Sequence, residues 1–203
     1  MLLTSLRALP NMQVWRPCDA FETAVAWRAA IEHAGPSVIA LTRQPLAQQT
    51  RPAGRQTLVS RGGYVLIDCA GPPECLVIAT GSEVALAAEA VQALNAEGRS
   101  VRLISMPSTQ VFDAQEPAYR ESVLPRSVRR RLAVEAGSAL SWWPYVGLEG
   151  RVLGINRFGA SGKGAELMAH FGFTATRVRQ EIEALLDGES AEAEAAERLS
   201  AAL

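Results

Sequence analysis

The chain has 203 residues, enough for one or two domains with a full core, and its 20 lysines and arginines face 21 aspartates and glutamates. The net charge of −1 argues against whole-chain attraction to nucleic acid or an anionic membrane, and no apolar run approaches the roughly 20 residues of a membrane span. Three cysteines, Cys18, Cys69 and Cys75, match no zinc-site spacing and imply no disulfide framework, so a reducing cytoplasmic compartment is expected.

Residues 19–33 are predicted to form the first well-defined helix. Asp19 and Glu22 have the D-x-x-E spacing of a capping box, in which each end of the pair satisfies a free backbone amide. The apolar stripe of this helix is formed by Ala24, Trp27 and Ile31, with Phe21 and Val25 beside it. Gly35-Pro36 then ends the helix.

Two strands flank this helix, a short one over 13–16 and a more apolar one over 37–42. Because so few strands cannot form a stable sheet, residues 1–50 are interpreted as the edge of a larger domain whose other strands are missing. Their apolar surface is therefore expected to associate with another copy or to stay poorly ordered. Prolines and a glycine follow, and we place a linker at 51–61.

The remainder of the chain predicts one α/β domain over residues 62–187. Strands are expected at 63–69, 75–80, 100–106, 131–135 and 152–155, an amphipathic helix after Gly81-Ser82, and a last helix at 174–186. The β-α-β unit over 75–106 should pair its strands in parallel through a right-handed crossover. Residues 107–127 are predicted to be a loop with one short helix, and residues 188–203 a low-complexity tail to which we assign no function.

Arg43 is the sharpest candidate for ligand binding, because it directly follows the apolar strand at 37–42. Ligands of open α/β sheets lie beyond the carboxyl ends of the strands. A guanidinium offers its N–H donors in a planar fork that suits a phosphate or a carboxylate. From this pattern alone, a ligand-binding arginine and an ordinary surface arginine remain open.

Short motifs along the chain resemble those of bacterial transketolases. They occur in unbroken order over about residues 7 to 187 and read PNMQVWRPCDAFETAVAWRAAIE, LTRQPLAQQ, RGGYVLIDC, VIATGSEVALA, SMPST, FDAQEPAYRESVLP, VEAG, YVGLEG and FGASGKGAELMAHFGFT. The resemblance implies a three-layer α/β/α C-terminal domain with a five-stranded mixed sheet whose first strand runs against the rest. It also implies that residues 1–50 are the C-terminal remnant of the pyrimidine-binding domain, a partial α/β unit.

The resemblance also assigns a role to Arg43. In transketolases the arginine of this S/T-R-Q motif binds the phosphate of the sugar-phosphate substrate, and Gln44 would then be a packing or positioning neighbour. The family transfers a two-carbon ketol unit between sugar phosphates with thiamine diphosphate and magnesium or calcium, and it acts as a homodimer.

The family's G-D-G motif with its later asparagine, which holds the diphosphate and the metal, is absent from this sequence. We therefore expect the chain alone to bind no cofactor and to be inactive, as part of a larger transketolase. The missing N-terminal portion or a second copy would be its partner, with no role for nucleic acid or membrane. A stand-alone, non-catalytic binding or dimerisation module remains an alternative, and so does a related thiamine-dependent enzyme, whose motifs match less closely.

Other candidate residues have simpler interpretations. Ser82 is predicted to be a helix N-cap and not part of a nucleotide site. The loop 159–164 lacks the order of a phosphate loop, and its Ser-Gly-Lys-Gly departs from the family's usual Ser-Ala-Pro, so it is interpreted as structural. Neither His33 nor His170 has a partner at metal-ligand spacing.

Three further features remain open between structure and function. The aromatic cluster of Trp142, Trp143 and Tyr145 is interpreted as packing. Glu135 could be a ligand or interface carboxylate, or a cap. The basic run is interpreted as a solvated rim and consists of Arg126, Arg129, Arg130 and Arg131.

Overall fold

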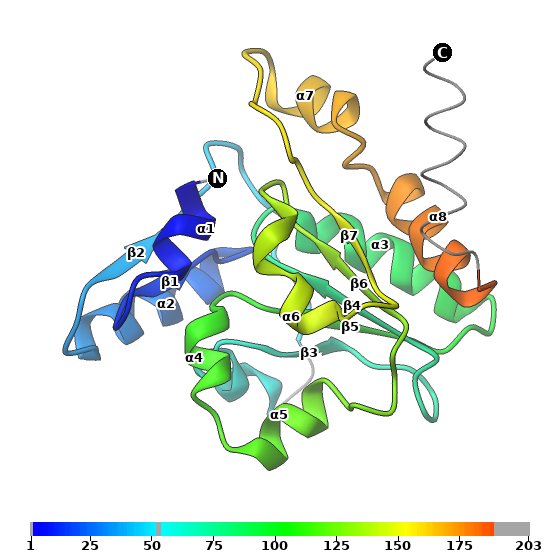
Figure 1. Cartoon of the computed structure of the whole chain (residues 1–203), viewed down its shortest axis with the longest axis horizontal. Helices are drawn as coiled ribbons and strands as arrows, with labels where there is room; N and C mark the ends of the chain where they lie inside the picture. The colour runs from blue at the N-terminus through cyan, green and yellow to red at the C-terminus, as the bar shows by residue number, and fades with distance from the viewer. Residues whose placement is uncertain (1, 52–53, 189–203) are drawn as a thin grey trace.

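The computed structural model describes residues 2–51 and 54–188, and its strands form two separate sheets (Figure 1). The first sheet pairs β1 (Gln13–Trp15) with β2 (Ser37–Ile39) in parallel. The second has five strands in the order β3-β5-β4-β6-β7, with bounds Tyr64–Ile67, Val101–Ser105, Cys75–Ala79, Arg131–Val134 and Arg151–Leu153. All but the first residue of the predicted tail lie outside the described residues.

The five-stranded sheet confirms the predicted α/β architecture. Its central strand β4 is buried along its whole length, as expected for a strand covered on both faces. β4 pairs in parallel with β5 and β6, and α3 (Glu83–Ala96) makes the crossover between β4 and β5. β3 pairs antiparallel with β5, so the first strand does run against the others.

Helices cover both faces of this sheet. On one face α3 and α8 (Ala175–Leu186) pack together, and their apolar side chains join those of the sheet in one buried cluster. On the other face a second cluster includes Phe112 and Trp142 from α4 (Thr109–Asp113) and from the turn before α6 (Trp143–Val146). Figure 1 shows the two helical layers on opposite sides of the strands. The predicted three layers are therefore present.

α2 (Ala20–Glu32) packs beside the small sheet. Its first turn shows one of the two hydrogen bonds of the predicted capping box. The Asp19 carboxylate accepts the backbone N–H of Glu22 at 2.9 Å, as a capping box requires. The Glu22 carboxylate accepts from Cys18 N at 2.8 Å and not from the cap residue itself. β2 ends at Ile39, earlier than the predicted residue 42, because its pairing with β1 covers three residues only.

The apolar stripe of α2 is exposed. Trp27 and Ile31 are 55 % and 80 % exposed, whereas the buried residues of the helix are Glu22 and Ala26. The helix therefore packs onto the rest of the chain through its opposite face. A two-stranded parallel sheet with an uncovered apolar helix is consistent with a domain whose other strands are supplied elsewhere.

Short helices were the elements that the sequence pattern missed. The segment predicted to contain one short helix has two, α4 and α5 (Pro117–Val123), and the predicted linker contains a 3-10 helix, η1 (Arg55–Arg61). The remaining unpredicted elements are α1 (Leu2–Arg7), the 3-10 turn η2 (Ala139–Ser141), α6 and α7 (Gly164–His170). Each is too short to show a helical repeat of apolar residues. No helix in the described part of the chain is long and apolar enough to span a membrane.

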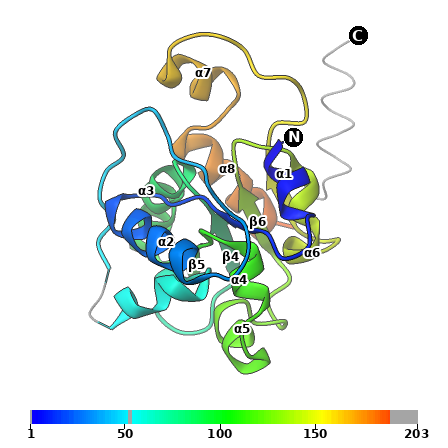
Figure 2. The ribbon, with the colours of Figure 1, turned by 90° about the vertical axis from the view of Figure 1, so that its left-hand side faces the viewer.

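Residues 13–16 lie against the carboxyl ends of the parallel strands of the large sheet, as Figure 2 shows from that side. Arg16 N donates to Pro107 O at 2.7 Å, and Gly81 N donates to Arg16 O at 3.0 Å. Gly81 has a φ of +59°, and a Cβ added there would be 2.9 Å from Cζ of Arg16. A glycine is thus needed at position 81 both for its backbone conformation and for the guanidinium above it.

We predict that Gly81→Ala lowers the free energy of unfolding by about 2–4 kcal/mol, because left-handed strain and the contact with Arg16 add together. Gly98→Ala is the matched control, since Gly98 also has positive φ (+89°) but no atom within 4 Å of an added Cβ. It should cost about 1–2 kcal/mol through backbone strain alone. Urea unfolding of both variants measures the difference, and equal losses would contradict the proposed contact.

Candidate functional site

Arg43 lies in the exposed segment that follows β2. Within the described residues its side chain forms no hydrogen bond or ion pair, so its guanidinium is accessible to an anion. Thr42 Oγ1 donates to Gln44 O at 3.0 Å and so folds the segment locally. The Gln44 side chain packs against Gly164, where an added Cβ would collide with it. Gln44 thus makes a packing contact, and its role in positioning Arg43 stays a prediction.

A buried polar cluster joins the start of α2 to the large sheet. We call it the Glu22 network, and it consists of Asp19, Glu22, Arg51, Tyr64 and Ser105. Glu22 Oε1 accepts from the Tyr64 hydroxyl at 2.8 Å and from Ser105 Oγ at 2.6 Å. Arg51 donates to Asp19 at 2.7 Å and, through Nε, to the Tyr64 hydroxyl at 2.8 Å.

Burial and nearby negative charge act in the same direction on the Tyr64 hydroxyl and on the thiol of neighbouring Cys18. Burial, together with the nearby Glu22 carboxylate, raises the pKa of Tyr64 far above its ordinary value. The same two causes, in the same order, raise the pKa of the Cys18 thiol. Tyr64 and Cys18 are therefore neutral at physiological pH, and Cys18 is not a reactive thiolate.

A second buried cluster, the Glu135 network, consists of Arg7, Arg16, Glu83, Glu135 and Trp142. Arg7 donates to both carboxylate oxygens of Glu135, each at 2.7 Å, and Trp142 Nε1 donates to Oε2 at 2.7 Å. Arg16 pairs with Glu83 and lies 3.5 Å from Glu135. Glu83 also accepts the backbone N–H of Ala136 at 2.9 Å.

The Glu135 network shifts the pKa of its members through competing effects. Burial alone would raise the pKa of the Glu135 carboxyl, but the hydrogen bonds and charge of Arg7, with the charge of Arg16, leave it below its ordinary value. Burial would likewise lower the pKa of Arg16, and the Glu83 carboxylate reverses this and raises it. Glu135 and Arg16 therefore each keep their charge, because a partner of opposite charge lies beside them.

These networks settle the role of Glu135 and reveal residues that the sequence did not mark. Glu135 is an interface carboxylate, one of the alternatives left open. Arg7 and Glu135 are 128 positions apart, so no local pattern could connect them. The sequence marked Asp19 and Glu22 as a capping box and Glu135 as a candidate carboxylate, but it did not connect them with their partners. Both networks orient residues 2–51 on the large sheet, and neither presents an accessible reactive group.

Ser82 does not act as the predicted side-chain cap. It occupies the N-cap position of α3, but its φ and ψ of −59° and −24° are helical and its side chain makes no capping bond. Its hydroxyl donates to Glu83 instead. The extended backbone that directs a cap side chain toward the helix amides is missing here.

The loop 159–164 leads into α7, which begins at Gly164. Lys163 occupies the N-cap position of α7, and its ammonium pairs with Glu166 at 3.4 Å on the surface. His33 Nε2 lies 3.0 Å from Asn11 O, and His170 Nε2 lies 3.2 Å from a guanidinium nitrogen of Arg157. Both histidines lie near the surface, and each contacts a nearby polar group.

The aromatic cluster packs as expected for two of its three members. Trp142 is fully buried, and its ring centroid lies 5.8 Å from that of Tyr145. Trp143 is 47 % exposed.

Arg131 departs from the solvated rim predicted for the basic run, because its guanidinium is half-buried and donates to the carbonyl oxygens of Val128, Tyr145 and Pro125.

Comparisons with known proteins point to one family. The family model described as "Transketolase, pyrimidine binding domain" matches residues 1–49, and "Transketolase-like TK C-terminal domain" matches residues 62–174. Transketolase 1 of Vibrio cholerae and Transketolase 1 of Escherichia coli K12 are each 52 % identical over 185 residues, which is 91 % of this chain. The chain spans only 28 % of the length of these relatives.

Solved structures agree with the sequence comparisons. A Pichia stipitis transketolase in complex with sedoheptulose 7-phosphate superposes with a TM-score of 0.83 at 38 % identity, covering 91 % of this chain and 26 % of the other. The Leishmania mexicana transketolase gives 0.84 at 35 % identity, covering 92 % and 27 %. A split-gene transketolase, described as an inactive β4 tetramer, gives 0.70 at 26 % identity, covering 90 % of this chain and 60 % of its own.

We predict that Glu135→Gln destabilises the fold by about 3 kcal/mol near neutral pH, because it leaves buried Arg7 without its charged partner. Since the folded pKa of Glu135 lies below the ordinary value of about 4.3, its contribution is fully present above that pH and is lost as pH falls through the folded pKa. The variant should therefore show a shallower loss of stability in acid than the wild type.

Urea unfolding between about pH 7 and about pH 3 measures this difference directly. Glu32→Gln is the matched control, because Glu32 forms an exposed pair with Arg28 at 2.8 Å and should leave the acid limb unchanged. Parallel acid limbs for the wild type and Glu135→Gln would contradict the assignment.

Proposed function

The chain belongs to the transketolase family, and from that premise we propose that it works as the C-terminal portion of an enzyme that transfers a two-carbon ketol unit between sugar phosphates. The observation that carries this proposal is the order of the two matches, with the pyrimidine-binding model before the C-terminal model over one continuous chain. Identity of 52 % over 91 % of the chain supports it.

The proposed organisation has four parts. Residues 1–50 are the end of the pyrimidine-binding domain, 51–61 the linker, 62–187 the C-terminal domain and 188–203 a tail. The two separate sheets and the family matches on either side of the linker support this division. The buried networks would then fix how one domain sits on the other.

We propose that Arg43 binds the phosphate of the sugar substrate in the complete enzyme. Three observations support it: Arg43 follows the carboxyl end of a parallel strand, it is exposed, and it has no protein partner within the described residues. A related enzyme is described in complex with a sugar phosphate. The contact of Gln44 with Gly164 would position the segment that contains Arg43.

Thiamine diphosphate, with magnesium or calcium, is proposed for the complete enzyme, where it would supply a sink for the carbanion formed when the ketol bond breaks. The described residues do not fit the metal, because no three His, Cys, Asp or Glu side chains gather among them as a ligand set. The buried carboxylates Glu22, Glu83 and Glu135 are already satisfied by protein donors. We therefore assign no step of the reaction to a cofactor held by this chain.

The exposed stripe of α2 supports a polypeptide partner, either the missing N-terminal portion of the enzyme or a second copy in a homodimer. Trp27 and Ile31 leave an apolar surface that water disfavours. The split-gene relative favours a separately made portion as the partner that covers this surface.

A non-catalytic assembly module is the second candidate function, and that relative's description as inactive supports it. The three unpaired cysteines suit the proposed cytoplasmic location.

In a complete enzyme that contains this chain, Arg43→Ala should raise the KM for phosphorylated sugars by roughly 10- to 100-fold, the loss expected for a charged hydrogen bond to phosphate. Arg43→Lys should recover part of this loss, because it keeps the charge but not the planar fork. Steady-state kinetics with ribose 5-phosphate, and with unphosphorylated glycolaldehyde as the control acceptor, test it. An equal rise in KM for both acceptors would refute a phosphate contact.

The purified chain alone should show no ketol transfer from xylulose 5-phosphate. Addition of the N-terminal portion of the Escherichia coli relative, ending where this chain's match begins, should produce activity. Introducing a charge with Ile31→Lys should weaken this complementation, whereas Leu148→Lys, at a fully exposed leucine elsewhere, should not. Turnover or saturable thiamine diphosphate binding by the chain alone would overturn the proposal.

A further inference from the structure

Two adjoining hollows lie at the amino end of β6, beside α5 and α6. Their volumes are about 230 and 240 Å³, and both are lined by Arg126 and Arg131. Arg120 lines one of them and Arg129 the other. We call this region the arginine hollow.

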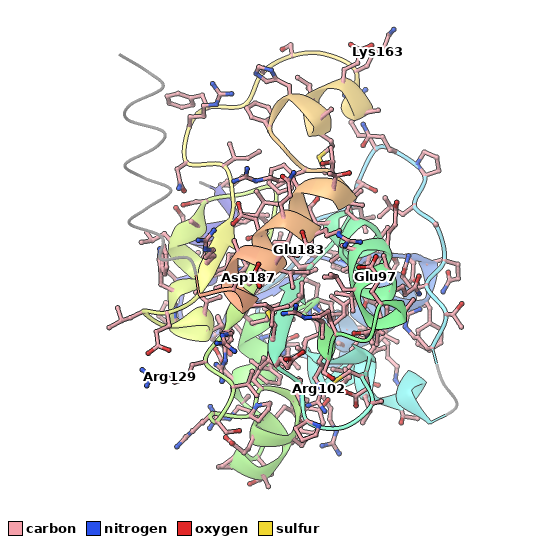
Figure 3. The ribbon with its side chains drawn as sticks, turned by 90° about the vertical axis from the view of Figure 1, so that its right-hand side faces the viewer. Glu97, Arg102, Arg129, Lys163, Glu183 and Asp187 are labelled. Atoms are coloured by element: carbon pink, nitrogen blue, oxygen red, sulfur yellow. The ribbon has the colours of Figure 1, made fainter. Side chains whose placement is uncertain are left out.

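The arginine hollow is remote from the Arg43 segment. Arg131 begins β6, whereas the joint with residues 2–51 is formed at the other, carboxyl end of the parallel strands, where Gly81 and Glu135 lie. Figure 3 shows Arg129 and Lys163, the latter next to the glycine that contacts Gln44, at opposite ends of the molecule. A ligand in the hollow would not touch the proposed substrate site.

In two of its arginines the described residues leave something uncompensated, the net charge of Arg131 and one buried donor of Arg120. Arg131 donates to backbone carbonyls that fix its guanidinium in place, but no carboxylate within the described chain forms an ion pair with it. Burial lowers the pKa of Arg131, and the charge of Glu121 offsets this effect only in part. The Nε atom of Arg120 is buried and has no hydrogen-bond partner among the described residues.

The acidic groups around the hollow leave room for an anion. Arg126 and Arg129 pair with Glu121 at 3.6 Å and Glu149 at 2.6 Å, and exposed pairs of this kind are weak and can rearrange. Asp113 lies in the wall, but it accepts the Tyr145 hydroxyl at 2.6 Å. Burial raises the pKa of Asp113, so its repulsion of an anion weakens as pH falls.

We propose that the arginine hollow binds the phosphate group of a small molecule. Arg131 is held in place and adds its charge, while the exposed Arg126 and Arg129 can turn their N–H donors toward the several oxygens of a tetrahedral oxyanion. The hollow has the size of one small ligand, and carboxylates at its rim oppose an extended polyanion such as RNA. The site belongs to the C-terminal domain and is additional to the phosphate contact proposed for Arg43.

The test uses inorganic phosphate as the probe and isothermal titration of the whole chain carrying Arg43→Ala, so that the proposed substrate contact is removed. Saturable phosphate binding is expected, and acetate at the same ionic strength should bind more weakly. Arg120→Gln should weaken phosphate binding about tenfold or more, as expected for loss of a charged hydrogen bond.

Two further variants make the result decisive. Arg126→Gln changes a side chain that is 90 % exposed, so it should leave folding intact and still weaken phosphate binding. Arg28→Gln, at an exposed arginine paired with Glu32 on α2, should have no effect. The proposal is overturned by undetectable phosphate binding, by acetate binding as well as phosphate, or by unchanged binding in both hollow variants.

Discussion

The pairing of the buried carboxylates Glu22 and Glu135 is the constraint on which the rest of the structure depends. Both carboxylates are buried at the joint, where an uncompensated charge would cost roughly several kcal/mol. Each is matched by donors from the other side of the joint, Glu22 by Tyr64 and Ser105 and Glu135 by Arg7. Residues 2–51 therefore cannot shift on the large sheet without leaving buried charge unpaired.

This rigid joint gives the exposed segment after β2 a defined position. Gln44 makes a second contact on Gly164, so the loop that contains Arg43 is located by the C-terminal domain as well as by its own short sheet. The same joint buries Glu22 and Ala26 of α2 and turns Trp27 and Ile31 outward. One orientation thus accounts for both an accessible cation and an exposed apolar surface.

The arginines at the amino end of β6 are compensated differently from those at the joint. At the joint, arginines meet carboxylates and their charge is neutralised. At the arginine hollow, Arg131 meets carbonyl oxygens, which satisfy its donors but leave its net charge in place. A half-buried cation that is hydrogen-bonded but not neutralised attracts an anion from outside. The C-terminal domain would therefore contribute a ligand site of its own to the family's architecture.

The sequence by itself determined the features that depend on local pattern. These are the buried strand β4, the α3 crossover, the place of Arg43 after a strand and the family motifs. Only the tertiary structure decided that Arg7 pairs with Glu135, that Ser82 does not cap α3 and that Arg131 is half-buried. The reason is physical: periodicity records which faces of a segment avoid water, whereas the partner of a charge depends on which distant segments the fold brings together.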